Sequence, residues 1–404
     1  MYLHVLASSL LVSVLGLGAL LTARLQGRVC RLTRDSAVAR TCAVSAVELG
    51  LLEIKQDTGW RTTWPNGTWM QNIPLGSGTF TLQGTDPADS DLTDSDSDVV
   101  ILTGLGVSGL ARHKVQVTVV PVIKPIEALA TCLDASGALQ VTSGNKITAT
   151  GAPVATNAQL TYVGTIDGTA EAQSLGTHTG TITGGAPLVP GPVRRMPASD
   201  VISRYAAKAT AVSYSATREK FVLGPGANPY GSTDPNGLYV INTNNASITI
   251  QKCRIWGTLV VLAGTGTVTV NDPVLIQNYR SDFPALLVSG NLIIKNTSAS
   301  TQLTESGCST NFNPSTVPYN GASDTDKTDS YPNEIDGLVH VDGTLSLQLT
   351  AKIVGAVICN GTVTCAGTNT IAYTSSLYTC PPKWYTYVSG MMLSPGSWTQ
   401  LVDP

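Results

Sequence analysis

Residues 337–347, GLVHVDGTLSL, contain the pattern that decides the fold of this chain. A short run of β-forming residues ends at a glycine, and a second short run with alternating side chains follows it. Related patterns occur at 257–270, 285–294 and 355–365, where a glycine or asparagine stands at the corner. These residues tolerate the backbone conformations that tight corners need. Two short strands that meet at such a corner are typical of one turn of a parallel β-helix, which stacks on the turns above and below.

These repeats predict a mainly β protein with a single-stranded, right-handed parallel β-helix that carries irregular insertions. A β-sandwich built from hairpins is the alternative, but it needs longer alternating strands and two-residue turns, which are scarce here. We expect short rungs at 124–190, the main β-helix at 239–380, and a cap over the last rung at 381–404. A linker at 191–238 should contain a short helix with Ser199 as its N-cap.

The composition excludes several classes of protein. Charged residues make up 13 % of the 404 residues, hydrophobic residues make up 42 %, and the net charge is −3. This much hydrophobic sequence with so little net charge is not typical of disorder. The low charge also argues against a coiled coil and against a nucleic-acid partner, which would need a basic surface.

The N-terminal residues 2–21, YLHVLASSLLVSVLGLGALL, contain no Lys, Arg, Asp or Glu. About 20 apolar residues are enough for a helix to cross a bilayer. We therefore predict a membrane span, with a cleaved signal peptide as the alternative. A cluster of arginines follows the apolar run, and charge alone would place this flank in the cytoplasm; it comprises Arg24, Arg28, Arg31, Arg34 and Arg40.

An amphipathic helix is expected at 36–56, continuous with the span, so that residues 1–57 form one helical region. Apolar or small residues recur there at intervals of three and four, namely at Val38, Cys42, Ser45 or Ala46, Leu49 and Leu52.

A small β domain with an acidic loop is expected at 58–123. Trp60, Trp64 and Trp69 should form its hydrophobic core at the end of the helix, although a carbohydrate- or membrane-contacting platform is the alternative. The acidic loop is either a solvated hairpin tip or a calcium loop, because alternating carboxylates supply the oxygen ligands that calcium prefers. Its candidate ligands are Asp86, Asp89, Asp91, Asp94, Asp96 and Asp98.

The eight cysteines have no zinc-site spacing. Cys359 or Cys365 could pair with Cys380 in an extracytoplasmic domain, or the cysteines could be buried free thiols. A long insert at 297–336 should leave one corner of the β-helix as a loop.

The apolar helix, its basic stretch and the segment AVSAVELGLLEI together resemble bacterial type IV pilin-like proteins with a minor-pilin X-type N-terminus. In that group an Ala-rich helix ends in a Glu-x-Gly element, which corresponds here to Glu48-Leu49-Gly50. The resemblance covers residues 1–122 and implies that the helix packs with like subunits. It also implies either an inner-membrane anchor with the β domains outside the cytoplasm or assembly on the cell surface. This orientation is opposite to the one that the arginine cluster alone would indicate.

We therefore expect a non-enzymatic, membrane-anchored surface protein that takes part in pilus-type filament assembly or adhesion. One alternative is a β-helix scaffold that polymerises at the membrane and resembles bacterial polymer-forming cytoskeletal proteins. A carbohydrate-active enzyme is the second alternative. It would need an acid/base groove built from carboxylates and neighbouring bases on the rungs; these are Asp272, Asp282, Glu334, Asp336 and Asp342 with Arg254, Arg280 and Lys352. No cofactor is expected except, in the calcium reading, Ca²⁺.

Overall fold

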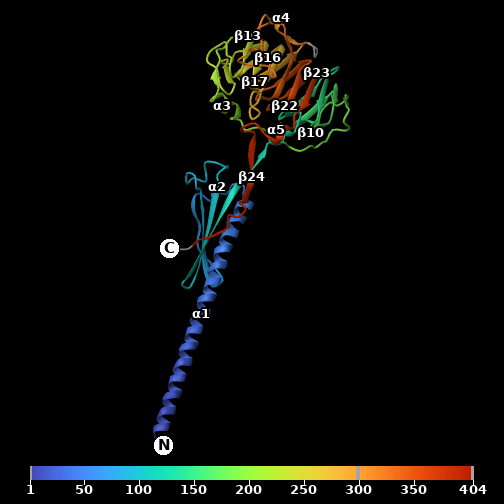
Figure 1. Cartoon of the computed structure of the whole chain (residues 1–404). Coiled ribbons are helices and arrows are strands. Elements are labelled where there is room, and N and C mark those ends of the chain that lie inside the picture. Colours follow the sequence, from blue (N-terminus) through green and yellow to red (C-terminus); the bar gives the residue numbers. More distant parts are fainter. Residues whose placement is uncertain (1, 297–300, 402–404) are drawn as a thin grey trace. The chain divides into compact units, whose positions relative to one another are not determined.

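The computed structural model describes residues 2–296 and 301–401, and the chain divides into two compact units (Figure 1). Among the described residues, the first unit contains 2–124 and 388–401, and the second contains 125–387. The boundary lies next to residue 123, where the small β domain is expected to end. The mainly β architecture, with a long N-terminal helix and a large parallel sheet, is confirmed.

The first unit is one long helix beside an antiparallel sheet. The helix α1 (Tyr2–Gln56) is continuous for 55 residues, as its sequence predicts. The sheet has the order β1-β2-β3-β4-β24, and β25 also pairs with β4. Its members and the short helix before them are α2 (Trp60–Thr63), β1 (Gly67–Leu75), β2 (Gly78–Thr85), β3 (Val100–Ser108), β4 (Ala111–Pro125), β24 (Thr386–Leu393) and β25 (Thr399–Leu401).

Small residues bring the second half of α1 close to this sheet. An added Cβ at Gly106 of β3 would lie 1.9 Å from the carbonyl oxygen of Ala39, and one at Gly104 would lie 2.2 Å from that of Ala43. The buried face of the helix consists of Ala39, Cys42, Ala43, Ala46, Val47, Gly50 and Ile54. The predicted face is confirmed at Cys42 and Ala46, whereas Leu52 is 45 % exposed and lies outside the buried face. The close backbone contact with β3 places small side chains such as Ala39 and Ala43 at its centre.

The second unit is a β-helix built from one 17-stranded sheet. Its first strands are β5 (Leu133–Ala135), β6 (Leu139–Val141), β7 (Lys146–Thr150), β8 (Val154–Tyr162), β9 (Thr165–Asp167), β10 (Ala170–Leu175) and β11 (Thr181–Ile182). The remaining strands are β12 (Thr210–Ala211), β13 (Thr217–Leu223), β14 (Leu238–Asn242), β15 (Ile248–Trp256), β16 (Thr258–Gln277), β17 (Leu286–Asn296), β20 (Glu334–Val341), β21 (Leu345–Leu349), β22 (Lys352–Cys359) and β23 (Val363–Tyr373). Neighbouring rungs pair in parallel, as in Ile250 with Val270.

The rungs do not stack in chain order. The first rungs of the chain lie beyond the last ones, because β22 pairs with β5 and β23 pairs with β6 and β7. The chain then returns to the opposite end, where β12 pairs with β14 and β13 with β15. Figure 1 shows this order, with the green β10 beyond the orange β22 and β23 and the yellow-green β13 at the other end. Stacking in this order was not expected from the sequence.

Ladders of aliphatic side chains fill the interior. One column runs through seven successive rungs, and each of its members is at most 1 % exposed; it contains Ile248, Val268, Leu292, Leu345, Val363, Leu139 and Leu160. Each fully buried aliphatic side chain of this kind stabilises the fold by about 1.5–3 kcal/mol relative to an exposed one. The eight cysteines, all in described residues, form no disulfide, and six of them are buried.

One face of the β-helix, which we call the covered face, lies under other segments. Its outward apolar residues pack against α3 (Val201–Ala206) and the 3₁₀ helix η1 (Glu127–Ala130). Leu377 of α5 (Ser376–Thr379) and Tyr385 complete this layer. The residue that precedes α3 is Asp200 rather than the predicted Ser199, and its carboxylate accepts a hydrogen bond from Arg204.

Two expected segments have other roles in the structure. Residues 191–238 do not form only a linker, because β12 and β13 within this range are rungs of the β-helix. In the predicted cap at 381–404, the described residues 381–401 do not cover the last rung: Tyr385 packs on the covered face, and β24 and β25 complete the sheet of the first unit. β24 and β25 pair with the edge of β4 that β3 leaves open, and local sequence patterns do not reveal this open edge.

The described part of the insert, 301–333, folds against the outer side of the β-helix. It contains β18 (Leu303–Thr304), α4 (Glu305–Cys308) and β19 (Ser330–Tyr331), and β18 pairs with β19. Its small core joins Phe312, Val317 and Tyr331 to Val222 and Leu275 of the rungs. Residues 297–300, the first part of the predicted insert, lie outside the described residues.

Candidate functional site

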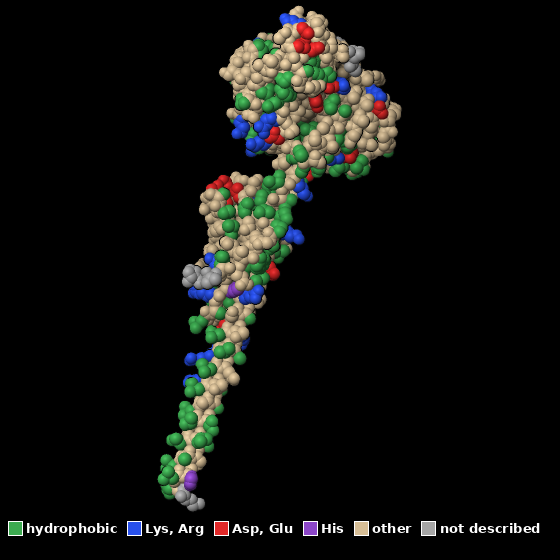
Figure 2. Space-filling model, in the orientation of Figure 1, with side chains coloured by type: hydrophobic (Ala, Val, Ile, Leu, Met, Phe, Trp, Pro, Cys, Tyr) green, Lys and Arg blue, Asp and Glu red, His purple; other side chains and the backbone are tan. Residues whose placement is uncertain are grey.

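The first half of α1 has the properties of a membrane anchor. In the described residues it is the one helix long and apolar enough to cross a membrane, and its most apolar window has no buried residue. Leu3 is 85 % exposed and Leu20 is 69 % exposed. Figure 2 shows hydrophobic side chains along this whole half of the helix. The protein itself covers none of this apolar surface.

The two residues of the Glu-x-Gly element lie on different sides of α1. Glu48 is exposed. Gly50 is buried, and an added Cβ there would lie 3.1 Å from Leu82 and 3.2 Å from Leu102. Gly50 therefore serves the contact between the helix and its own sheet. The role of Glu48 in assembly stays a prediction.

The tryptophans form the predicted core at the end of α1. Trp60 and Trp69 are 5 % and 8 % exposed, and their ring centroids lie 5.8 Å apart. The centroids of Trp64 and Trp69 lie 5.9 Å apart. Trp69 packs so closely over Gly84 that an added Cβ there would lie 2.2 Å from its ring. These contacts favour the core over an exposed binding platform.

The acidic loop closes around the guanidinium of Arg61. This buried side chain donates hydrogen bonds to the carbonyl oxygens of Leu92, Asp96 and Asp98. Several loop carboxylates accept hydrogen bonds from nearby backbone, such as that of Asp86 from Ala88. Burial and a hydrogen bond with Asp94 raise the pKa of Asp98. The six aspartates contain no group of three with mutually close ligand atoms. Calcium binding by this loop stays a prediction.

A second face of the β-helix, which we call the hydroxyl face, exposes polar residues in register. One outward column contains Ser247, Thr267, Asn291, Thr344 and Thr362, and a second contains Thr217, Thr249, Thr269, Ile293, Ser346 and Thr364. In a third column, Asn271 donates a hydrogen bond to Gln251, and Gln251 donates one to Glu219. Ile293 and Lys295 interrupt the pattern. Parallel strands repeat about every 4.8 Å, so this face is a regular two-dimensional array.

The groups considered for an acid/base groove have structural partners. Arg280 forms an ion pair with Asp282 at 2.7 Å, and Lys352 forms one with Glu334 at 2.6 Å. Arg254 is 1 % exposed, and its guanidinium donates to the carbonyl oxygens of Phe312, Val317 and Pro318 in the insert. Burial lowers the pKa of Arg254 to about 10.

The remaining groove candidates are spread over the β-helix. Asp342 accepts a hydrogen bond from Asn360, and Asp336 accepts one from Gln277. Burial raises the pKa of both carboxyls. Asp272 lies in β16, before Pro273. Asp342 and Asp336 thus have polar partners within the β-helix. The absence of an enzymatic activity stays a prediction.

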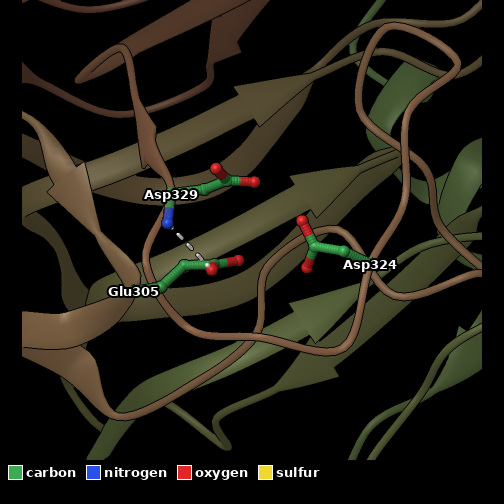
Figure 3. A group of neighbouring side chains, drawn as sticks. All are labelled: Glu305, Asp324 and Asp329. Carbon is green, nitrogen blue, oxygen red and sulfur yellow. Dashed lines mark hydrogen bonds between the residues drawn. The ribbon is translucent and has the colours of Figure 1, made fainter.

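Three carboxylates that no local sequence pattern connects meet in the insert. Glu305 is fully buried, and Asp324 and Asp329 are half-buried. One ligand oxygen from each lies within 4.8 Å of those from the others. Figure 3 shows the three side chains converging from separate parts of the insert. The aspartates were visible in the sequence as part of a loop, but their approach to Glu305 depends on the folded insert.

No family model and no curated protein matches the chain. Among solved structures, it is similar to the competence-associated pilin ComZ from Thermus thermophilus, with 12 % identity over 91 % of this chain and 97 % of that chain and a TM-score of 0.32. It is similar to an ice-binding protein from an Antarctic biological consortium, with 17 % identity over 62 % of this chain and 91 % of that chain and a TM-score of 0.31. It is also similar to an ice-binding domain from Shewanella frigidimarina, with 14 % identity over 63 % and 98 % and a TM-score of 0.31.

Proposed function

We propose that this protein is a non-enzymatic, membrane-anchored surface protein that takes part in pilus-type assembly or adhesion. The observation that carries the proposal is the division of α1 into two halves. Its first half is apolar and wholly exposed, and its second half is packed on a small antiparallel sheet. A single continuous helix of this kind can be held in a membrane and can later pack with the helices of like subunits.

Lateral packing of α1 would bury the apolar surface that a membrane otherwise covers, which would stabilise a filament. In this proposal the β domains lie outside the cytoplasm. The arginines that follow the apolar run do not exclude this orientation, because flanking charge has little control over long translocated domains. In this arrangement the β-helix supplies a stiff, weakly charged surface for contacts. The ion-paired or buried state of most groove candidates supports a non-enzymatic role.

A substitution in the apolar half tests the anchor. Arginine at the centre of a membrane helix costs about 2.5–3.5 kcal/mol on insertion, so Leu11→Arg should reduce membrane retention several-fold. Leu52→Arg is the matched control, because Leu52 is an exposed leucine of the same helix outside the apolar half. Fractionation of expressing cells, with electron microscopy of sheared surface material, measures retention and filament incorporation. Equal retention of both variants, or a C-terminal domain sheltered from protease in intact cells, would contradict the proposal.

A second candidate function is favoured by the hydroxyl face. A regular array of hydroxyl and amide groups suits a partner surface that has a regular repeat of its own, and ice is such a surface. In this second hypothesis the β-helix binds ice and α1 anchors it to the membrane.

Uptake into slowly growing ice tests this second candidate. The detergent-solubilised chain should be enriched in the ice, and Thr269→Lys with Thr364→Lys should abolish the enrichment. Thr370→Lys, on another outward column, should leave it unchanged. A wild-type chain that partitions like a non-binding protein would exclude ice as the ligand.

A further inference from the structure

The carboxylates of the insert have the spacing of ligands around one ion. Glu305 begins α4, whereas Asp324 and Asp329 belong to the loop before β19. Calcium holds its oxygen ligands at about 2.4 Å, so two ligands of one ion lie at most about 4.8 Å apart. The oxygens of Glu305, Asp324 and Asp329 all satisfy this limit. In Figure 3 the three carboxylates point toward a common centre.

These carboxylates have no cationic side chain as a partner in the described residues. Glu305 accepts hydrogen bonds from the backbone of Phe312 and Asp329 and from the hydroxyl of Tyr331. The nearby guanidinium of Arg254 is used on backbone carbonyls instead. A fully buried carboxylate beside two others is costly unless a positive charge compensates it.

A buried carboxamide supplies an independent observation at the same place. Asn313 is 3 % exposed, and its Nδ2 lies 3.0 Å from Asp329 Oδ2 and 3.4 Å from Asp324 Oδ2. Its Oδ1 is buried and has no hydrogen-bond partner. An unpaired buried oxygen is unfavourable. A half-turn of the carboxamide would exchange the positions of Oδ1 and Nδ2. The oxygen would then face the carboxylates, where it could coordinate a cation together with them.

We propose that Glu305, Asp324, Asp329 and Asn313 bind one calcium ion. Every candidate ligand is an oxygen, and hard divalent cations prefer carboxylate, amide and water oxygens. Calcium accepts six to eight ligands in irregular geometry, and water can reach the half-exposed side of Asp324 and Asp329. The ion joins the start of the insert to its end.

Calcium titration of the full chain in detergent tests this site. After treatment with EGTA, the chain is titrated with CaCl₂ by calorimetry, and Tb³⁺ luminescence excited through Tyr331 reports the same place. Asp324→Asn and Asp329→Asn should each weaken one calcium equivalent at least 10-fold. Asp326→Asn is the matched control, because this exposed aspartate of the same loop bonds to Thr328 and lies outside the cluster. Asp94→Asn changes only the acidic loop and therefore shows whether that loop accounts for any of the bound calcium.

A gain-of-charge variant distinguishes a ligand from a structural residue. Asn313→Asp should be less stable than wild type in EGTA, since it adds a fourth carboxylate, and should bind calcium more tightly and melt at a higher temperature in its presence. A folded wild-type chain that binds no calcium overturns the proposal. So does a calcium equivalent that is equal in wild type, Asp324→Asn and Asp329→Asn, or an Asn313→Asp variant that calcium does not stabilise.

Discussion

At the scale of single residues, the covered face holds two buried titratable groups on nearby rungs. His340 is in register with Ile358, and Ile358 is in register with Asp134. Burial lowers the pKa of His340 to about 3 and raises that of Asp134 to about 7. His340 has Tyr385 as a hydrogen-bond partner, whereas both carboxylate oxygens of Asp134 have none. This layer therefore favours the uncharged form of each group.

Asp134→Leu should stabilise the β-helix by about 1–3 kcal/mol at pH 8, because it removes a buried carboxylate without partners. The folded pKa of about 7 lies above the ordinary value of 3.8. The penalty is thus complete above pH 7 and disappears as the pH falls toward 4. The gain should be clearly smaller at pH 5. Urea unfolding at both pH values, with Asp134→Asn as the isosteric comparison, measures it. An equal gain at both pH values would contradict the assignment.

At the scale of elements, the backbones of α1 and β3 approach so closely that no room is left for large side chains between them. This requires glycine on the strand and small residues on the helix, as at Gly106 and Ala39. The same helix offers leucines throughout its apolar half, where the protein makes no contact. The two halves thus use different side chains for two different environments.

Gly106→Ala should destabilise the first unit by about 1–3 kcal/mol, since the added methyl group forces the helix away from the sheet. Gly27→Ala is the control, because nothing lies within 4 Å of its added Cβ. In a helix interior this change is neutral or stabilising by up to about 1 kcal/mol. Thermal unfolding followed by tryptophan fluorescence compares the two variants. If both unfold like wild type, the close packing does not exist in solution.

At the scale of the whole molecule, the order of the rungs couples distant parts of the chain. Val363 lies between Leu345 on one side and Leu139 on the other. Rungs contact only their neighbours, so the first rungs in the chain depend on the last ones for a stacking surface.

Val363→Asp should therefore remove amide hydrogen-exchange protection from 133–182 as well as from 345–373. It places a charge without a partner in the interior column. Thr364→Asp changes the adjacent outward residue and should leave both regions protected. Exchange measured by mass spectrometry resolves the two regions. Protection that persists in 133–182 while 345–373 opens would refute the stacking order.

The sequence by itself determined the long apolar helix, the small β domain after it and the β-helix, because each follows from local periodicity and turn residues. The tryptophan core was predictable for the same reason. The tertiary structure alone decided that Leu52 is exposed while Ala39 and Ala43 contact the sheet, where the first rungs stack, and that residues 388–401 return to the first sheet. Aliphatic rungs stack equally well in many orders, and an open strand edge accepts any suitable partner. Glu305 and Asp324 likewise meet only because the insert folds, since no local spacing connects them.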